Sequence, residues 1–405
     1  MKRYVIVGAG ARCYSMFVLG LGGAHSDTVS LVGVYDTNIR RSEFFRETVG
    51  DSMTVYTDFD EMLSSERPDG VIVTTVDSKH AEYIVRALDR GFDVISEKPI
   101  CNTYADCIAI RDAERRSGKR VTVAFNCRFM PYFARLKELV LSGAVGRIYS
   151  VNYEYSLNRS HGGDYFKRWH RHMDVSQGML VHKSTHHFDI VNWLLDDLPT
   201  SVTAMGLRSF YGNPEKSYAN RCSECPRTAD CDSAKLPAAS YYKRLYFDAE
   251  CEDGYLRDRC AHLPDTDIYD NMSVSVAYSR GTLLTYSLNL FSMREGYRIT
   301  LTGEDGVILG ECFNSGFGVE DRFVVRILRG AGEVEEIVFP KATGEHGGGD
   351  ARLLDMIFGA ECPDPLGQRA DSFAGFSSAM IGIGANESIR TRRTVDLTKP
   401  LEELK

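Results

Sequence analysis

The 405-residue sequence contains no run of about 18 consecutive apolar residues, the length that a membrane-spanning helix requires. It also lacks a basic excess, because 48 Lys and Arg residues are set against 56 Asp and Glu residues, for a formal net charge of -8. Proteins that bind nucleic acid duplexes need a basic field to neutralise phosphates. The sequence therefore predicts neither a membrane span nor a nucleic-acid partner.

Cysteine is too sparse for a disulfide-stabilised scaffold, since the 11 cysteines are only about 3% of the residues. The amino terminus has basic residues and a short apolar run, as a signal peptide does, but Gly8 and Gly10 interrupt that run too early. We therefore predict a cytoplasmic protein. Buried free thiols are expected at six scattered cysteines: Cys13, Cys101, Cys107, Cys127, Cys312 and Cys362.

The length favours two domains, and 43% apolar residues suit a folded globular chain. Strand-like apolar runs alternate with helical segments up to residue 126, which predicts a doubly wound parallel sheet. Later segments alternate polar and apolar residues between turn sequences such as SRG and GEDG, which predicts antiparallel strands. The expected fold is α/β, with an N-terminal domain at 1–125 and an α/β domain at 126–405. The later strands are expected at 147–158, 272–278, 282–290, 297–303, 322–329 and 334–339.

A dinucleotide site is indicated after the first strand, where Gly8 and Gly10 open a helix. Glycines there let backbone N–H groups approach a pyrophosphate at the helix N-terminus. The third glycine of the usual fingerprint is absent. Asp36, at the end of the second strand, is placed to bind ribose hydroxyls and to repel a 2′-phosphate, although Arg40 and Arg41 follow closely. These residues predict a Rossmann domain that prefers NAD.

Several motifs occur in an order that is typical of one enzyme family. Glu97-Lys98-Pro99 and the G-x-G-x-R at Gly8 to Arg12 resemble motifs of the Gfo/Idh/MocA oxidoreductases. "TTVDSKH" ending at His80, "FNCRFMP" at 125–131 and a histidine-rich segment at 179–193 add to the resemblance. It implies an NAD-dependent enzyme whose C-terminal α/β domain has a large open, mainly antiparallel sheet. It also implies a homo-oligomer, either a dimer or a tetramer.

The resemblance also implies the residues that meet the cofactor. In the family the E-K-P lysine sits beside the nicotinamide and the reacting hydroxyl, and the matching residue is Lys98. An ammonium near a hydroxyl that is being oxidised favours loss of its proton. The implied cofactor-binding set is Gly8, Gly10, Ala11, Arg12, Asp36, Thr75, His80, Glu97 and Lys98.

The segment MLVHKSTHHFDIVNW, residues 179–193, has the pattern of a helix, on which His182, His186 and Asp189 share one stripe. The family pattern is D-x-x-x-H-x-x-D, so His182 stands where aspartate is common. We expect His186 to be the general base, Asp189 to orient it, and His182 to bind substrate or act as a second base. A zinc site at the two histidines and purely structural histidines are the alternatives.

Basic and aromatic side chains are interleaved over residues 160–178, which is long for a simple connection. Aromatic faces stack on sugars and arginines bind anions in a bidentate manner, so we predict a carbohydrate substrate with an affinity for acidic groups. A solvated basic loop is the alternative. The candidate substrate-binding residues are Asn126, Arg128, Tyr153, Arg168, Trp169, Lys183 and Asp189, with His346 and Asp350 at the rim.

A polar insertion at about residues 209–270 carries further cysteines. Cys222, Cys225, Cys231 and Cys260 could form a structural zinc site, with Cys251 as a competing fourth ligand. Free thiols and a redox pair are the alternatives.

The leading functional hypothesis is an NAD-dependent oxidoreductase that oxidises a secondary hydroxyl of a sugar, sugar acid or cyclitol. The first alternative is an NAD-dependent glycosidase. Such an enzyme oxidises the sugar at C3, eliminates the aglycone, adds water and reduces the ketone again. Its substrate would be an acidic or sulfonated glycoside such as a sulfoquinovoside, and His182 or Tyr153 would supply the second base. A non-catalytic sugar sensor is the third hypothesis, and it has no need of Lys98 and His186.

Overall fold

Two β-sheets organise the protein in a computed structural model, which describes every residue except 235–239, 317–318, 320, 331, 342 and 360–362. The N-terminal sheet has six strands in the order β3-β2-β1-β4-β5-β6, and all of its pairings are parallel. The C-terminal sheet has nine strands and is mostly antiparallel. The predicted fold class is therefore confirmed.

The N-terminal sheet is a Rossmann sheet whose strands are buried runs of β-branched and other apolar residues. Local sequence sets the helix ends, since Thr103 and Asp106 form a capping box that starts α6 and Gly118 ends it. The elements are β1 Lys2–Val7, α1 Ala11–Cys13, α2 Leu19–Ala24, β2 Val29–Tyr35, α3 Ile39–Val49, β3 Thr54–Tyr56, α4 Phe59–Glu66, β4 Gly70–Val73, α5 His80–Asp89, β5 Asp93–Ser96, α6 Tyr104–Ser117 and β6 Val121–Val123.

The C-terminal sheet has the order β14-β13-β12-β11-β7-β10-β9-β8-β15, with β7 and β10 parallel to each other. Its strands are β7 Ile148–Asn158, β8 Pro199–Leu207, β9 Asn271–Tyr278, β10 Leu283–Ser292, β11 Glu295–Gly303, β12 Gly306–Ser315, β13 Arg322–Arg329, β14 Glu333–Pro340 and β15 Val395–Asp396. The helices are α7 Pro131–Leu141, α8 Arg159–Tyr165, α9 Met173–Ser176, α10 Gly178–His182, α11 Thr185–Leu195, α12 Ser240–Tyr242, α13 Glu250–Asp253, α14 Gly349–Phe358, α15 Ser372–Thr391 and α16 Thr398–Leu404.

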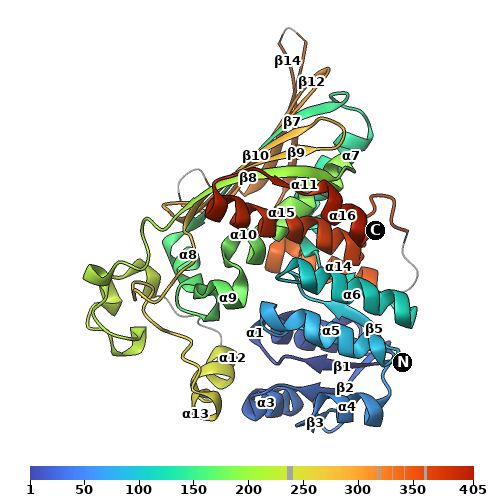
Figure 1. Cartoon of the computed structure of the whole chain (residues 1–405), viewed down its shortest axis with the longest axis vertical. Helices are drawn as coiled ribbons and strands as arrows, with labels where there is room; N and C mark the ends of the chain where they lie inside the picture. The colour runs from blue at the N-terminus through green and yellow to red at the C-terminus, as the bar shows by residue number, and fades with distance from the viewer. Residues whose placement is uncertain (235–239, 317–318, 320, 331, 342, 360–362) are drawn as a thin grey trace.

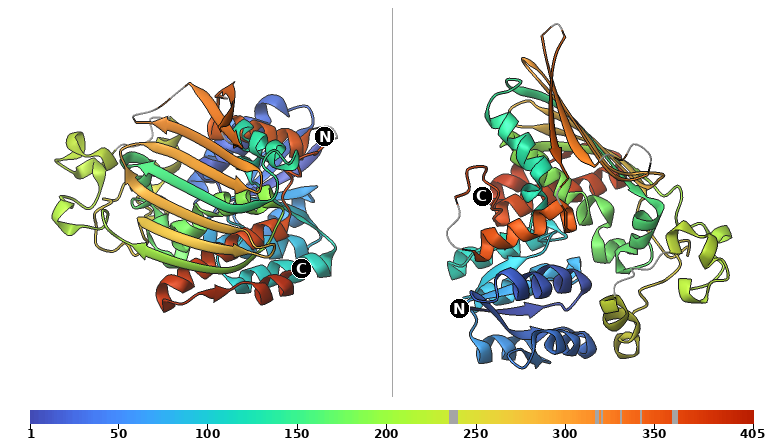
Figure 2. Two further views of the ribbon diagram at one scale, coloured as in Figure 1. Left: turned by 90° about the horizontal axis from the view of Figure 1, so that it is seen from above. Right: turned by 180° about the vertical axis from the view of Figure 1, so that it is seen from behind.

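Helices α11 and α15 form a layer between the large sheet and the Rossmann domain (Figure 1). Helix α15 packs on β8 and on α11, and it also contacts α6 of the first domain. The opposite face of the large sheet carries no helix (Figure 2). This layering explains the alternation along β9 and β10, in which every second residue is buried.

Three strands of the large sheet were not predicted, namely β8, β12 and β15. Gly310 weakens the strand pattern of β12, but it is required there because a Cβ at this position would lie 2.2 Å from the Tyr132 hydroxyl oxygen. Strand β15 has only two residues, which is too short to show a period. The buried thiols are confirmed at Cys13, Cys101, Cys107, Cys127 and Cys312, while Cys362 lies outside the described residues.

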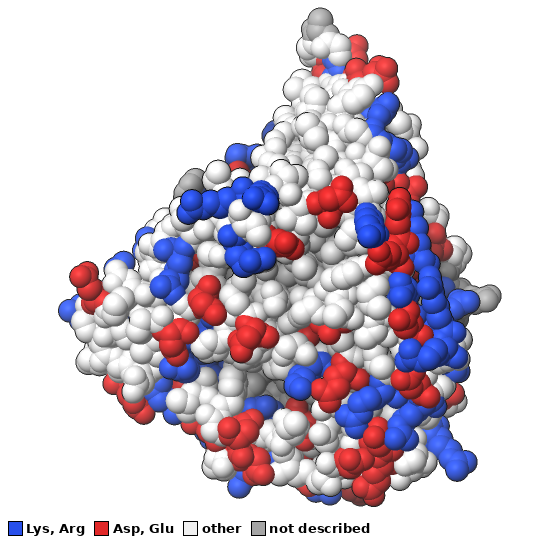
Figure 3. All heavy atoms as spheres, viewed as in Figure 1, with Lys and Arg blue, Asp and Glu red and all other residues white. Residues whose placement is uncertain are grey.

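Among the described residues no helix is long and apolar enough to cross a membrane. On the face shown in Figure 3, cationic and anionic side chains are interspersed rather than separated into one basic field. The insertion at 209–270 is built of short helical turns where it is described, and its α12 and α13 lie beside α3 of the Rossmann domain (Figure 1).

The close approach at Gly310 predicts that Gly310→Ala destabilises the protein by about 1–3 kcal/mol through overpacking against Tyr132. Tyr132→Phe should recover most of this loss in the double variant, since the buried hydroxyl has no hydrogen-bond partner among the described residues. Urea unfolding midpoints measure both effects. Gly22→Ala is the control, because nothing lies within 4 Å of its added Cβ. An unchanged midpoint for Gly310→Ala would contradict this packing.

Candidate functional site

The turn between β1 and α1 has the geometry of a dinucleotide cradle. Gly8 has φ +96°, and a Cβ there would lie 2.6 Å from backbone atoms of Thr74 and Thr75, so only glycine fits. From Ala11 the helix continues through a π turn, Tyr14–Val18, to Ala24, and its first N–H groups face this turn. The residues present therefore suit a pyrophosphate bound at a helix N-terminus.

Asp36 ends β2 beside this turn. Its carboxylate accepts hydrogen bonds from the backbone N–H groups of Ala9 and Asn38, each at 2.7 Å. The Arg41 guanidinium lies 3.8 Å from the same carboxylate. The structure thus places the predicted ribose-binding carboxylate next to the predicted glycines.

Arg12 joins the turn to both domains. Its guanidinium donates to Glu97 at 2.7 Å and to Asp350 at 2.6 and 3.1 Å. The Asn126 side-chain amide donates to the same Asp350 carboxylate at 2.6 Å. Burial raises the pKa of Asp350, but hydrogen bonds from His346 and Arg12 outweigh this and leave the pKa below its ordinary value. The predicted Arg12, Glu97 and Asn126 therefore lie in one network.

His80 links the E-K-P turn to the segment that follows β4. Its Nδ1 lies 2.7 Å from the Pro99 carbonyl oxygen and its Nε2 lies 3.1 Å from that of Thr75. These two contacts tie the "TTVDSKH" segment to the turn that carries Lys98.

Lys98 reaches the histidine-rich segment, because its Nζ donates to the His182 carbonyl oxygen at 2.9 Å. His182 Nδ1 in turn lies 2.6 Å from an oxygen of Asp77. Burial lowers the pKa of His182 well below its ordinary value and raises that of Asp77. Asp77 of the first domain therefore brings a carboxylate next to His182, the position where aspartate is common in the family. We did not predict Asp77 as a site residue.

The prediction of a single helix at 179–193 is wrong in one respect. The segment forms two helices, α10 and α11, which are interrupted between His182 and Thr185. The backbone N–H groups of Lys183 and Ser184 both donate to the Met179 carbonyl, and the Ser184 hydroxyl donates to it as well. This competition for one acceptor shifts the hydrogen-bond ladder. His182 and His186 consequently belong to different helices.

His186 lines a cavity of about 360 Å³ between the large sheet and the residues near His346, a size typical of small-molecule sites. Its Nδ1 has no hydrogen-bond partner in the part of the chain that the structure describes. Burial lowers the pKa of His186 well below its ordinary value, and the charges of Lys98 and Lys183 lower it further. His186 is therefore neutral near neutral pH, and a neutral imidazole has one unprotonated nitrogen that can accept a proton.

The same cavity contains predicted and unpredicted polar groups. Tyr153, Lys183 and His346 were predicted from the sequence. Seven others were missed, because most of them come from distant strands and loops that only the fold brings together: Tyr155, His161, His187, Glu295, Tyr297, Asn314 and Lys341. His161 Nδ1 lies 2.8 Å from a carboxylate oxygen of Glu295, so these two side chains are each other's partners. Lys183 and Lys341 contribute ammonium groups to the same wall.

Arg128 and Asp189 pair with each other, so Asp189 does not orient His186 as we expected. Two guanidinium nitrogens donate to the carboxylate at 2.6 and 2.8 Å, and both side chains are buried. Arg128 also donates to the Gly367 carbonyl at 3.2 Å. The predicted substrate ligands Arg128 and Asp189 are thus already each other's partners beneath the site.

The basic segment at 160–178 folds into short helices, and its cations have carboxylate partners. Asp164 lies 3.0 Å from Arg168 and 2.8 Å from Arg257 of the insertion. The solvated loop that we considered as an alternative is therefore absent from this segment. Trp169 lies with its ring 5.7 Å from that of His182 in an edge-to-face arrangement, so it borders the Lys98 side of the site.

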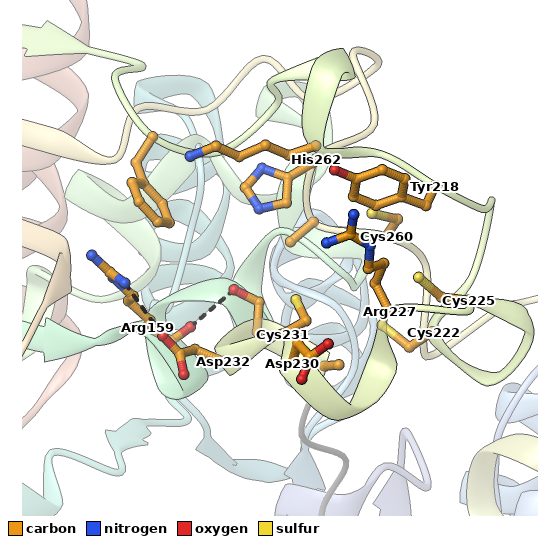
Figure 4. Close-up of a pocket in the computed structure, with 15 residues that line it drawn as sticks. Arg159, Tyr218, Cys222, Cys225, Arg227, Asp230, Cys231, Asp232, Cys260 and His262 are labelled. Atoms are coloured by element: carbon orange, nitrogen blue, oxygen red, sulfur yellow. Dashed lines mark hydrogen bonds and ion pairs between the residues drawn. The ribbon is translucent and has the colours of Figure 1, made fainter.

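The four insertion cysteines line one cavity of about 200 Å³ with Arg227 (Figure 4). Zinc bound by four thiolates at about 2.3 Å requires closely gathered sulfurs. Among the described residues the sole group of three potential ligand atoms within 4.8 Å of one another is Glu345, His346 and Asp350. The predicted cysteine set is therefore not assembled. The Arg12 guanidinium already lies against this group, 2.6 Å from Asp350 and 3.6 Å from Glu345.

Comparison with known proteins identifies the family. The description "Oxidoreductase family, NAD-binding Rossmann fold" matches residues 2–125, and "Oxidoreductase family, C-terminal alpha/beta domain" matches residues 137–397. The chain belongs to the Gfo/Idh/MocA oxidoreductases, and the resemblance inferred from the motifs is confirmed.

Two relatives illustrate the range of similarity. YteT of Bacillus subtilis is 33% identical over 99% of this chain and 97% of its own length. The inositol 2-dehydrogenase of Rubrobacter xylanophilus is 26% identical over 47% of this chain and 54% of its own length. Among solved structures, the WlbA dehydrogenase from Chromobacterium violaceum in complex with NADH and UDP-GlcNAcA has a TM-score of 0.67 and 19% identity, covering 98% of this chain and 96% of that one. That likeness shows the fold.

Arg128→Met should destabilise the protein by about 3–5 kcal/mol, because it leaves the buried Asp189 carboxylate without its guanidinium partner. The measurement is the free energy of unfolding in urea. Arg135→Met is the matched control, since its pair with Glu138 is exposed and contributes about 0–1 kcal/mol. Wild-type stability with a raised KM for Arg128→Met would instead place this guanidinium in contact with substrate.

Proposed function

We propose that the protein is an NAD-dependent dehydrogenase that oxidises a secondary hydroxyl of a sugar, sugar acid or cyclitol. The observation that carries this proposal is the placement of Lys98 between the cofactor turn and the histidine-rich segment, through its bond to the His182 carbonyl. The family and its inositol dehydrogenase members support a polyhydroxylated substrate. The cavity beside His186 supplies a polar wall for such a molecule.

Each chain residue has a defined task in this proposal. NAD, when bound, supplies the hydride acceptor. Lys98, whose pKa burial lowers, stabilises negative charge that develops on the substrate oxygen. His186, which lines the cavity, takes the hydroxyl proton on its unprotonated ring nitrogen. Lys183 and Tyr153 bind further hydroxyls from the cavity wall.

The glycosidase remains the second candidate, and the Asp77–His182 pair is the observation that favours it. A second proton-transfer centre is required to remove the C–H proton next to a ketone, and this pair lies on the Lys98 side of the site. An acidic substrate would be attracted by Lys183 and Lys341 of the cavity wall.

The deciding experiment adds NAD to the purified protein with a panel of free sugars, cyclitols and aryl glycosides, both neutral and anionic. A dehydrogenase accumulates NADH in proportion to substrate and releases no phenol. A redox-neutral glycosidase releases phenol without accumulating NADH. Failure of every substrate in both assays would count against both candidates.

Lys98→Met should lower kcat at least about 100-fold, because it removes the ammonium from the reacting oxygen. Steady-state rates on the substrate found above measure the loss. Lys79→Met is the matched control, since this lysine is exposed and pairs only with Glu82 among the described carboxylates. Turnover that survives Lys98→Met would remove Lys98 from the chemistry.

We further propose a homo-oligomer in which a second copy covers the helix-free face of the large sheet. Met205 and Leu207 of β8 project from that face and are 75% and 64% exposed, although α15 packs on the other side of the strand. Apolar side chains in such positions typify association surfaces. Figure 2 shows this face uncovered.

Sedimentation velocity should therefore show a dimer or tetramer, and Met205→Glu with Leu207→Glu should shift the distribution toward monomer because charges oppose burial. Leu141→Glu, at an exposed helix end, is the control that should leave assembly intact. A monomeric wild-type protein would contradict the proposed assembly.

A further inference from the structure

A segment of the insertion lies on the cofactor domain rather than on its own domain. We call residues 240–253 the strap; it comprises α12, a π turn at Lys243–Phe247, and α13. It contacts α3, and both views place it along the side of the Rossmann domain (Figures 1 and 2).

The strap is packed into the Rossmann domain. Leu245 is fully buried in the same apolar cluster as Phe45 of α3. The Asn38 side-chain amide donates to the Ala249 carbonyl oxygen at 3.0 Å, and both residues are fully buried. The Tyr241 ring lies 4.9 Å from that of Tyr14. These contacts fix the strap beside the end of β2.

Tyr246 of the strap reaches the dinucleotide turn itself. The Ala11 N–H, at the start of the helix, donates to the Tyr246 hydroxyl oxygen at 3.0 Å. The same oxygen is the nearest atom to a Cβ built on Gly10, at 3.7 Å. Backbone N–H groups in this position cradle pyrophosphate in Rossmann domains. A phenol that accepts from the N–H keeps its own proton to donate to a phosphate oxygen.

The strap also occupies the two arginines that follow Asp36. Arg41 donates through Nε to the Leu245 carbonyl at 3.0 Å and lies 2.8 Å from Asp253. Arg40 lies 3.7 Å from Glu252. An arginine just after β2 is the residue type that accommodates the 2′-phosphate of NADP. In this structure Asp253 and Glu252, which belong to the second domain, already pair with Arg41 and Arg40.

We propose that the strap is part of the dinucleotide site: the Tyr246 hydroxyl binds the pyrophosphate, and Asp253 with Glu252 keeps Arg41 and Arg40 from binding a 2′-phosphate. The second domain thereby contributes both affinity for the cofactor and selectivity for NAD. This inference rests on the use of NAD in the proposed function.

Titration calorimetry of the full chain with NAD, without substrate, tests the pyrophosphate contact. Tyr246→Phe should weaken NAD binding about tenfold, because one hydrogen bond to a charged group is lost. Tyr241→Phe is the matched control, since it removes a hydroxyl from the same strap away from the helix start. An unchanged or smaller dissociation constant for Tyr246→Phe would overturn this contact, because the hydroxyl would then merely fill the turn.

The ratio of the dissociation constants of NADP and NAD tests selectivity. Glu252→Gln with Asp253→Asn should lower that ratio about tenfold or more, since the freed arginines attract the extra phosphate. Asp248→Asn is the control, because this carboxylate pairs with Lys243 within the strap. An unchanged ratio in the double variant, or wild-type binding of NADP as tight as that of NAD, would overturn the selectivity role.

The two binding experiments are independent of turnover. Binding constants that change as expected in a chain that oxidises no sugar would leave the strap proposal standing and remove the proposed function. Sugar oxidation by the wild-type protein, with dissociation constants for NAD and NADP that do not change in the strap variants, would support the proposed function and overturn the strap proposal.

Discussion

The Arg12 guanidinium is the cation around which both halves of the site are arranged. Through Glu97 it holds the E-K-P turn, and through Asp350 it holds the carboxyl-terminal segment that closes the cavity. Asn126 and His346 bond to the same Asp350, so cofactor turn and cavity rim share one network. Buried charges of this kind are tolerated only when paired, which makes the relative position of the two domains part of the site.

Burial also sets the chemistry of the bases. His182 and His186 both lie near Lys98, and burial together with that charge keeps the pKa of each well below its ordinary value. The two histidines nevertheless differ, because His182 has Asp77 as a hydrogen-bond partner, whereas His186 lines the cavity and its buried Nδ1 has no partner among the described residues. The cavity thus has His186 in its wall, whereas the partnered His182 lies beside Lys98, and this asymmetry suits distinct proton-transfer roles.

The insertion contacts both domains. Its cysteine cavity is also lined by Arg159 of α8 in the C-terminal domain, whereas the strap contacts α3 of the Rossmann domain. Arg257 of the insertion pairs with Asp164 and so also fixes the basic segment that precedes the histidines. One polar segment without strong periodicity therefore touches the cofactor turn and the substrate side together.

The sequence by itself determined the fold class, the Rossmann turn at Gly8, Asp36 and the E-K-P motif, because these depend on local patterns of apolar strands and glycine conformations. It missed β12, whose glycine is explained only by contact with Tyr132, and the break before His186, which arises from competition for one carbonyl. The remaining site residues come from segments far apart in the chain. The tertiary structure decides which of them pair, as it does for Asp77 and His182. Local periodicity carries no information on such distant partners, so only the folded structure decided them.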